Sequence, residues 1–123
     1  MPTIPTGMLK QLYRRGSLRN VAGGWEFTMR NSLASATLVG IGVACNGVEL
    51  DTGTVRVVQP EAGMERSAAE ISAEEPLRFP VGVDTVIRVA GPSLPRGTHT
   101  LAVRADTREI GTVTIPVQDT LAE

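Results

Sequence analysis

The clearest alternation of apolar and polar residues in the chain runs from Gly24 to Arg30. Its apolar positions are Trp25, Phe27 and Met29, and its polar positions are Glu26, Thr28 and Arg30. A period of two residues is typical of a β-strand that buries one face and turns the other to water. The pattern therefore predicts a strand that buries the only tryptophan of the chain.

A second strand is predicted from Thr37 to Cys45. One face would carry Val39, Ile41, Val43 and Cys45, and the other Leu38, Gly40, Gly42 and Ala44. Such small residues let another backbone or a partner's side chains approach closely. Close packing inside the domain is the interpretation favoured here, and approach by a partner is the alternative.

A tight hairpin is predicted to follow at Asn46-Gly47. This dipeptide fits a two-residue type I′ turn, because both positions require a positive φ angle that Asn and Gly tolerate best. The resulting register sets Cys45 opposite Val48 and Val43 opposite Leu50. The apolar face is thus expected to continue across the hairpin.

Further strands are predicted along the rest of the chain, separated by Gly and Pro turns. Residues 8–15 read as a poor strand, with a short helix as the alternative. Residues 59–76 break every period and predict a solvated loop or a flap that faces a partner, with a capping box at Ser67 to Glu70. The other predicted strands are 54–58, 77–83 at an edge, 84–90, 98–106 and 109–117.

This succession predicts an all-β fold, a two-sheet antiparallel β-sandwich with generally immunoglobulin-like architecture. The 123 residues suffice for one domain. We expect an extended N-terminal lead-in at residues 1–7, a single sandwich domain at 8–118 and a C-terminal tail at 119–123, with fraying from Gln118 onward.

Composition narrows the classes of partner. The formal net charge is −1 with both signs interspersed, so neither nucleic acid nor an anionic membrane is an expected partner. A single cysteine permits no internal disulfide, and no long apolar run opens the chain, so a cytoplasmic location is expected.

Candidate chemistry is sparse. His99 and Cys45 are the only histidine and cysteine, too few for a zinc or iron site within one chain. His99 is interpreted as a hydrogen-bonding turn residue and Cys45 as a small buried hydrophobe. The glutamates of the 59–76 loop are interpreted as solvated. No catalytic, cofactor-binding or metal-binding residue is predicted on this chain.

A family resemblance carries the functional expectation. The segment Ser17-Leu-Arg-Asn-Val21 followed by Gly24-Trp-Glu-Phe-Thr-Met-Arg30 resembles the small β subunit of bacterial C-glycoside deglycosidases. The likeness continues through Val43 to Glu49 and, more weakly, through 67–89 and 94–103. After Arg30 this chain reads Asn-Ser-Leu-Ala-Ser, where that family has an aromatic-rich loop.

The resemblance implies an accessory subunit without activity of its own. The large α subunit would resemble a TIM barrel, bind a divalent metal, with Mn²⁺ as the expected ion, and carry the acid and base. The complex would cleave a 3-keto C-glycoside between sugar and aromatic aglycone by β-elimination. The alternative hypothesis is a stand-alone immunoglobulin-like carbohydrate-binding or structural interaction module.

Two loops are expected to contact the partner. The first, residues 31–36, joins the two clearest strands, and the second is residues 59–75. The candidate contact residues are Arg30, Asn31, Ser32, Leu33, Ser35, Met64 and Arg66.

Overall fold

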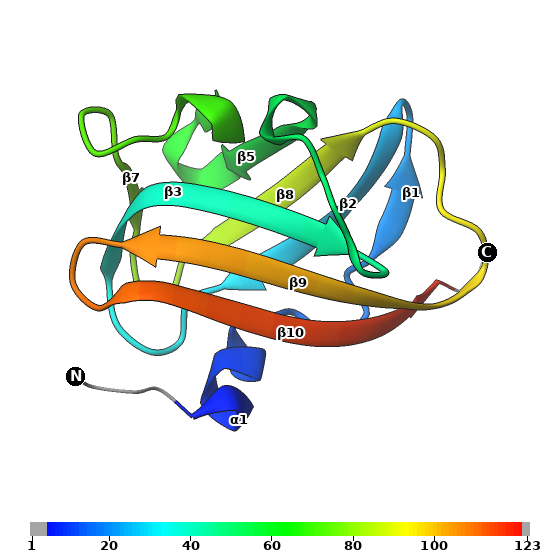
Figure 1. The fold of residues 1–123 in the computed structure, drawn as a ribbon, viewed down its shortest axis with the longest axis horizontal. Helices are drawn as coiled ribbons and strands as arrows, with labels where there is room; N and C mark the ends of the chain where they lie inside the picture. Colours follow the sequence, from blue (N-terminus) through cyan, green and yellow to red (C-terminus); the bar gives the residue numbers. More distant parts are fainter. Residues whose placement is uncertain (1–4, 122–123) are drawn as a thin grey trace.

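The computed structural model describes residues 5–121 and confirms the all-β sandwich. Two antiparallel sheets pack face to face, and a short helical segment lies against the strand β10 at one edge (Figure 1). Residues 1–4 of the expected lead-in and 122–123 of the expected tail lie outside the described residues.

The first sheet has the strand order β1-β2-β8-β5-β6. Its strands are β1 (Arg19–Val21), β2 (Gly24–Arg30), β8 (Asp84–Ala90), β5 (Val55–Gln59) and β6 (Met64–Ser67). The predicted strand at 84–90 is thus confirmed. By contrast, β6 forms inside the segment that was expected to lack regular structure.

The second sheet has the order β10-β9-β3-β4, and β7 pairs with the start of β3. Its strands are β10 (Gly111–Leu121), β9 (Gly97–Thr107), β3 (Ala36–Cys45), β4 (Val48–Glu49) and β7 (Leu77–Phe79). The short helical segments are α1 (Thr6–Leu9), η1 (Lys10–Leu12), η2 (Thr52–Thr54), η3 (Pro60–Ala62) and η4 (Ala68–Glu70).

The core lies between the two sheets. Phe27 of β2 is fully buried, and its ring centroid lies 6.2 Å from that of Trp25 and 5.7 Å from that of Tyr13. Aromatic rings at these separations bury large apolar areas and pack favourably on one another. Val55 and Val57 of β5 are also fully buried, as their alternation predicted.

The hairpin at Asn46-Gly47 is confirmed. Both residues have positive φ angles, 51° and 84°, and Cys45 pairs with Val48. The expected continuation of the apolar face is wrong, however, because Val48 is 64% exposed. The reason is that β4 is the last strand of its sheet and only two residues long, so nothing covers it.

The predicted faces of β3 are partly wrong because the pairing with β9 shifts register between Leu38 and Gly40. A β-bulge inserts one residue and so changes the side to which the following residues point. As a result Leu38 and Ile41 are both buried, while Val39 is only half-buried.

Close packing within the domain explains the glycines of β3. A Cβ on Gly40 would lie 2.5 Å from Asp106 Oδ2, and one on Gly42 would lie 3.0 Å from the Arg104 guanidinium. Arg104 Nε and Asp106 Oδ1 are 3.5 Å apart, so this pair lies over the two glycines. The outer face of β3 is therefore covered by its neighbour β9.

Both ends of the chain differ from the sequence-based expectation. The segment at 8–15 is helical up to Leu12, which confirms the short-helix alternative over the strand, and Tyr13 makes an isolated β-bridge to Met29. At the other end β10 continues to Leu121, beyond the expected fraying at Gln118, because Asp119 and Leu121 are buried and β9 pairs along its whole length.

The predicted capping box is confirmed. The Ser67 side chain accepts a hydrogen bond from the Ala69 amide at 3.3 Å, and the Glu70 carboxylate accepts one from the Ser67 amide at 3.4 Å. These two bonds start the single helical turn η4.

We predict that Gly24→Ala strongly destabilises the domain, since a Cβ at this position would lie 1.9 Å from the carbonyl oxygen of Val89. The clash is with backbone of the paired strand β8, which cannot rotate away. The free energy of unfolding should fall by about 3 kcal/mol or more. Urea unfolding followed by Trp25 fluorescence measures it.

The matched control is Gly53→Ala, whose Cβ would come no closer than 3.4 Å to Asp51 Oδ1. This variant should unfold within about 0.5 kcal/mol of the parent. Equal stability of the two variants would contradict the close approach of β2 to β8.

Candidate functional site

His99 is held inside the domain as a hydrogen-bonding residue. Its side chain is 4% exposed, and Nε2 donates to the Pro95 carbonyl at 2.7 Å. Nδ1 therefore accepts from Asn46 Nδ2 at 3.0 Å, while Asn46 Oδ1 accepts the Thr100 amide. With both ring nitrogens engaged, His99 fastens the β3–β4 turn to the start of β9.

The single cysteine is a buried thiol. Cys45 is 8% exposed, and burial raises its pKa. A thiol with a raised pKa is a poor nucleophile because the reactive thiolate is scarce. Within residues 5–121 no group of three or more His, Cys, Asp or Glu side chains is placed to hold a metal ion.

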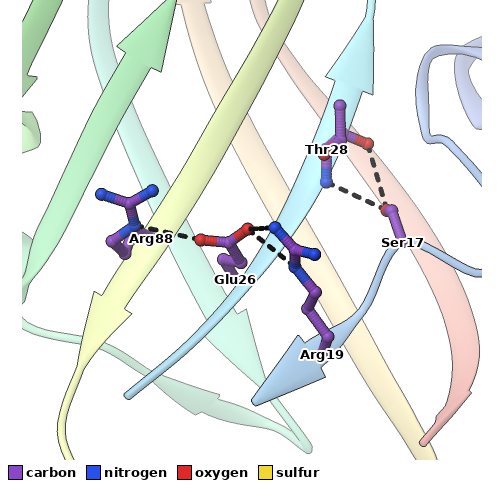
Figure 2. A network of polar contacts seen from close by, with 5 residues as sticks. All are labelled: Ser17, Arg19, Glu26, Thr28 and Arg88. Carbon is purple, nitrogen blue, oxygen red and sulfur yellow. Dashed lines mark hydrogen bonds and ion pairs between the residues drawn. The ribbon is translucent and has the colours of Figure 1, made fainter. Parts of the chain in front are cut away.

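Glu26 is a buried carboxylate on the outer face of the first sheet (Figure 2). Arg19 Nε and Nη2 donate to its Oε2 at 2.9 and 2.7 Å, and Arg88 Nε donates to its Oε1 at 3.0 Å. These three residues are cross-strand neighbours on β1, β2 and β8. The expectation that Glu26 faces water is wrong, because the arginine side chains cover it.

The electrostatics of Glu26 reflect two opposed effects. Burial would raise its pKa, but the hydrogen bonds and charges of Arg19 and Arg88 outweigh burial and lower it. Such pairing compensates the cost of removing a carboxylate from water. Glu26 therefore ties three strands together and is not free to act as a proton donor.

Asp119 is the second buried carboxylate. Its Oδ2 accepts hydrogen bonds from the Tyr13 hydroxyl at 2.6 Å and from the Gly16 amide at 2.9 Å, and its Oδ1 accepts the Thr120 amide at 2.8 Å. Burial would raise the pKa of Asp119, but these bonds and one from Leu18 lower it. Burial and the Asp119 contact together raise the pKa of Tyr13.

An apolar cavity of about 170 Å³ opens at the end of the sandwich where β3 begins. Its walls come from the N-terminal helical segment, the loop between β2 and β3, strand β7, and the turn between β9 and β10. The lining side chains are almost all apolar: Leu9, Leu12, Leu33, Ala34, Ala36, Leu38, Phe79, Ala105, Ile110, Val113 and Ile115, together with Asn31, Ser35, Thr107 and Glu109.

Exposed apolar side chains flank this cavity. Large exposed hydrophobic residues among those described are Met8, Val48 and Val81. Met8 precedes Leu9 of the cavity wall, and the Val81 amide donates to Oγ of Ser35 at 3.2 Å. Two of the three therefore lie beside the cavity. We call the exposed side chains of Met8 and Val81, with the half-buried Leu33, the apolar patch.

The loop candidates for partner contact lie at or near this cavity. Asn31, Leu33 and Ser35 line it, and Ser32 is exposed in the same loop. Asn31 itself is 2% exposed, and its amide group binds the Ala34 and Phe79 carbonyls and the Leu33 amide. It shapes the loop that presents Leu33. Their role as contacts stays a prediction.

The remaining candidates lie elsewhere. Arg30 forms an exposed ion pair with Asp84 at 3.1 Å. Met64 packs against the core, and Arg66 donates to the carbonyls of Pro76, Glu70 and Glu75 at 2.8 to 3.0 Å. Arg66 thus holds the 70–76 segment in place. Contact of these three residues with a partner remains untested.

Sequence reasoning did not find most of the cavity wall. Leu9 and Leu12, Phe79 and Ile110 come from three separate segments that meet only in the folded domain. The one available signal was the loop after Arg30, whose apolar Leu33 lies among polar and small residues. Among residues 5–121, no helix combines the length and the apolar character needed to cross a membrane.

The fold and these contacts define a two-sheet β-sandwich domain whose buried ionisable groups serve structure. The family model described as Hydroxymethylglutaryl-CoA reductase, N-terminal domain, matches residues 8–122. The chain belongs to that family. None of the curated proteins compared with the chain matches it.

This match overturns the resemblance to the small β subunit of C-glycoside deglycosidases. The family model covers nearly the whole chain, whereas the resemblance rested on short segments. Those segments have structural roles in this sandwich: Ser17 Oγ accepts the Thr28 amide, and Arg19 pairs with Glu26. The predicted lyase complex and its 3-keto C-glycoside substrate are therefore wrong, and the stand-alone module gains no support.

We predict that Glu26→Gln lowers the free energy of unfolding by about 1–3 kcal/mol at pH 7, because two charge-assisted interactions are lost. In the parent protein the stability that Glu26 contributes is fully present above about pH 4.5, the ordinary pKa of the carboxyl group. It is lost progressively as the pH falls below that value and through the lowered pKa of the folded state. The variant should lack that part of the acid sensitivity. Urea unfolding between pH 7 and pH 3 tests both.

Glu65→Gln is the matched control, since Glu65 pairs with Arg56 on the same sheet but is exposed. It should change stability by less than about 0.5 kcal/mol. If the two variants behaved alike, Glu26 would not be the buried centre of the network.

Proposed function

We propose that this chain is an accessory domain of a hydroxymethylglutaryl-CoA reductase that binds the reductase's catalytic part through the apolar cavity. It supplies no catalytic group itself. The observation that carries this proposal is the cavity of about 170 Å³ bordered by the exposed Met8 and Val81. The family match supports the choice of the reductase as the partner.

The size of the cavity supports one inserted side chain. An apolar cavity of about 150 Å³ stays dry and accepts a benzene molecule. The cavity here therefore has room for one aliphatic or aromatic side chain that protrudes from the partner. An anchor side chain buried in a pocket is the typical energetic centre of a protein interface.

The surroundings of the cavity support a specific orientation of that partner. Asn31 holds the loop that presents Leu33, so this wall is preorganised. At the opposite rim Glu109 accepts hydrogen bonds from the Thr37 amide and hydroxyl at 2.9 and 2.8 Å. An apolar centre with a polar rim is the common anatomy of a protein interface.

Some expectations about the partner now lack support. A barrel-like partner that holds Mn²⁺ was implied only by the overturned resemblance. The cytoplasmic location, inferred from the single cysteine, stays a prediction. The proposal requires only that the catalytic part present an apolar side chain, whether it lies on the same polypeptide or on another.

We predict that Val81→Asp weakens binding to the reductase of the same organism by about tenfold or more, because a carboxylate would be desolvated beside the cavity. Val81 is 51% exposed, so folding should be preserved. Sedimentation velocity with the purified reductase measures the association. The chain alone should not consume hydroxymethylglutaryl-CoA when reductant is supplied.

The matched control is Val48→Asp, the same change at a valine that is 64% exposed. Val48 pairs with Cys45 at the far end of β3 from the cavity, so binding should be unchanged. Consumption of the thioester by the chain alone, or no association of the parent protein, would refute the proposed function. Equal weakening by both variants would refute the assigned surface.

A further inference from the structure

A second, larger hollow lies along the free edge of β10. Its volume is about 690 Å³, and no residue of its wall belongs to the apolar cavity. The segment from Lys10 to Arg15 forms one side, and the outward residues near the start of β9 and the end of β10 form the other. Sites for small molecules have volumes of about 300–1,000 Å³.

Two cations line the hollow, and neither forms an ion pair within the part of the chain that the structure describes. Seven arginines form ion pairs within residues 5–121, namely Arg14, Arg19, Arg30, Arg56, Arg66, Arg88 and Arg104. Lys10 and Arg15 are exposed. Within residues 5–121 their side chains form no ion pair and no hydrogen bond. Two positive groups beside one hollow favour an anionic ligand.

The opposite wall carries neutral hydrogen-bonding groups. Thr98 Oγ1 and Thr120 Oγ1 lie 3.1 Å apart, and Gln118 Nε2 lies 3.5 Å from Thr100 Oγ1. These four side chains are adjacent across the β9–β10 pair and project from its outer face. Hydroxyl and amide groups in such an array bind ligand hydroxyl groups, because each both donates and accepts.

The one carboxylate in the wall is already engaged. Asp119 lines the hollow together with Lys10 and the threonines, but both its oxygens accept hydrogen bonds from the protein itself. It is 9% exposed, so little of it meets a ligand. The accessible charge of the hollow is therefore positive.

We infer that this hollow binds a phosphorylated sugar, with Lys10 and Arg15 on the phosphate and the Thr98, Thr100, Gln118 and Thr120 side chains on the sugar hydroxyls. Arginine and lysine are the usual cationic partners of phosphate. Nothing in the proposed role at the apolar cavity requires this second site.

Ribose 5-phosphate is a suitable probe, with ribose and inorganic phosphate as its two halves. We predict that ribose 5-phosphate binds at least about tenfold more tightly than either half. Lys10→Ala and Arg15→Ala should each weaken binding about fivefold or more, and added salt should weaken it further. Isothermal titration calorimetry measures affinity, and amide chemical shifts of Thr100 and Thr120 report the location.

Arg78→Ala is the matched control. Arg78 lies on β7, paired with Thr37 at the other end of the sheet, and forms no ion pair within the described residues. Binding should be unchanged in this variant. Unfolding curves of all three variants should overlay the parent curve, since the substituted side chains are exposed.

Three results would overturn the inference. The first is no binding of ribose 5-phosphate at about 10 mM. The second is unchanged affinity in both Lys10→Ala and Arg15→Ala. The third is inorganic phosphate bound as tightly as ribose 5-phosphate, which would remove the threonines and Gln118 from the site. None of these results bears on association with the reductase, so the two proposals fail separately.

Discussion

The contact between Tyr13 and Asp119 holds the two ends of the chain together. Tyr13 bridges to Met29 of the first sheet, while its hydroxyl donates to Asp119 of the last strand of the second sheet at 2.6 Å. Burying a carboxylate is costly unless it is well hydrogen-bonded, and Asp119 accepts four such bonds. The N-terminal segment is thereby fixed across the open end of the sandwich.

The Tyr13–Asp119 contact helps to position both candidate binding surfaces. Leu9 and Leu12 precede Tyr13 and form one wall of the apolar cavity. Lys10 and Arg15, on either side of Tyr13, form one side of the hollow along β10. The Tyr13–Asp119 bond thus adds to the burial of Leu9 and Leu12 in holding the N-terminal segment against the sheets.

The parts of the fold that the sequence predicts are those with local causes. The Asn46-Gly47 turn, the β8 alternation and the Ser67–Glu70 capping box each depend on residues a few positions apart. The bulge after Leu38 depends instead on pairing with β9, which is distant in sequence from β3, and the last residue of β10, Leu121, depends on pairing with Gly97 at the start of β9. Periodicity cannot report such contacts.

The candidate sites likewise divide into parts that depend on neighbouring residues and parts that depend on contacts formed only in the folded domain. The loop after Arg30 was identified from the sequence, and it lies at the apolar cavity because it joins the two sheets where the sandwich opens. Lys10 and Arg15 were not identified, since single cations in a short segment resemble any solvated surface. Their proposed role in binding a ligand depends on β9 and β10, which supply the hydroxyl groups of the hollow only after folding.

The misleading family likeness has a physical origin in the pairing of β1 with β2. Hydrogen bonds and an ion pair join β1 to β2 and stabilise these adjacent strands whatever the protein does. They are formed by Ser17, Arg19, Glu26 and Thr28 (Figure 2). Residues selected for strand pairing carry information about fold, whereas function resides in sites on the fold. In this domain the proposed sites are the cavity and the hollow, and no residue that lines either belongs to the segment from Ser17 to Arg30.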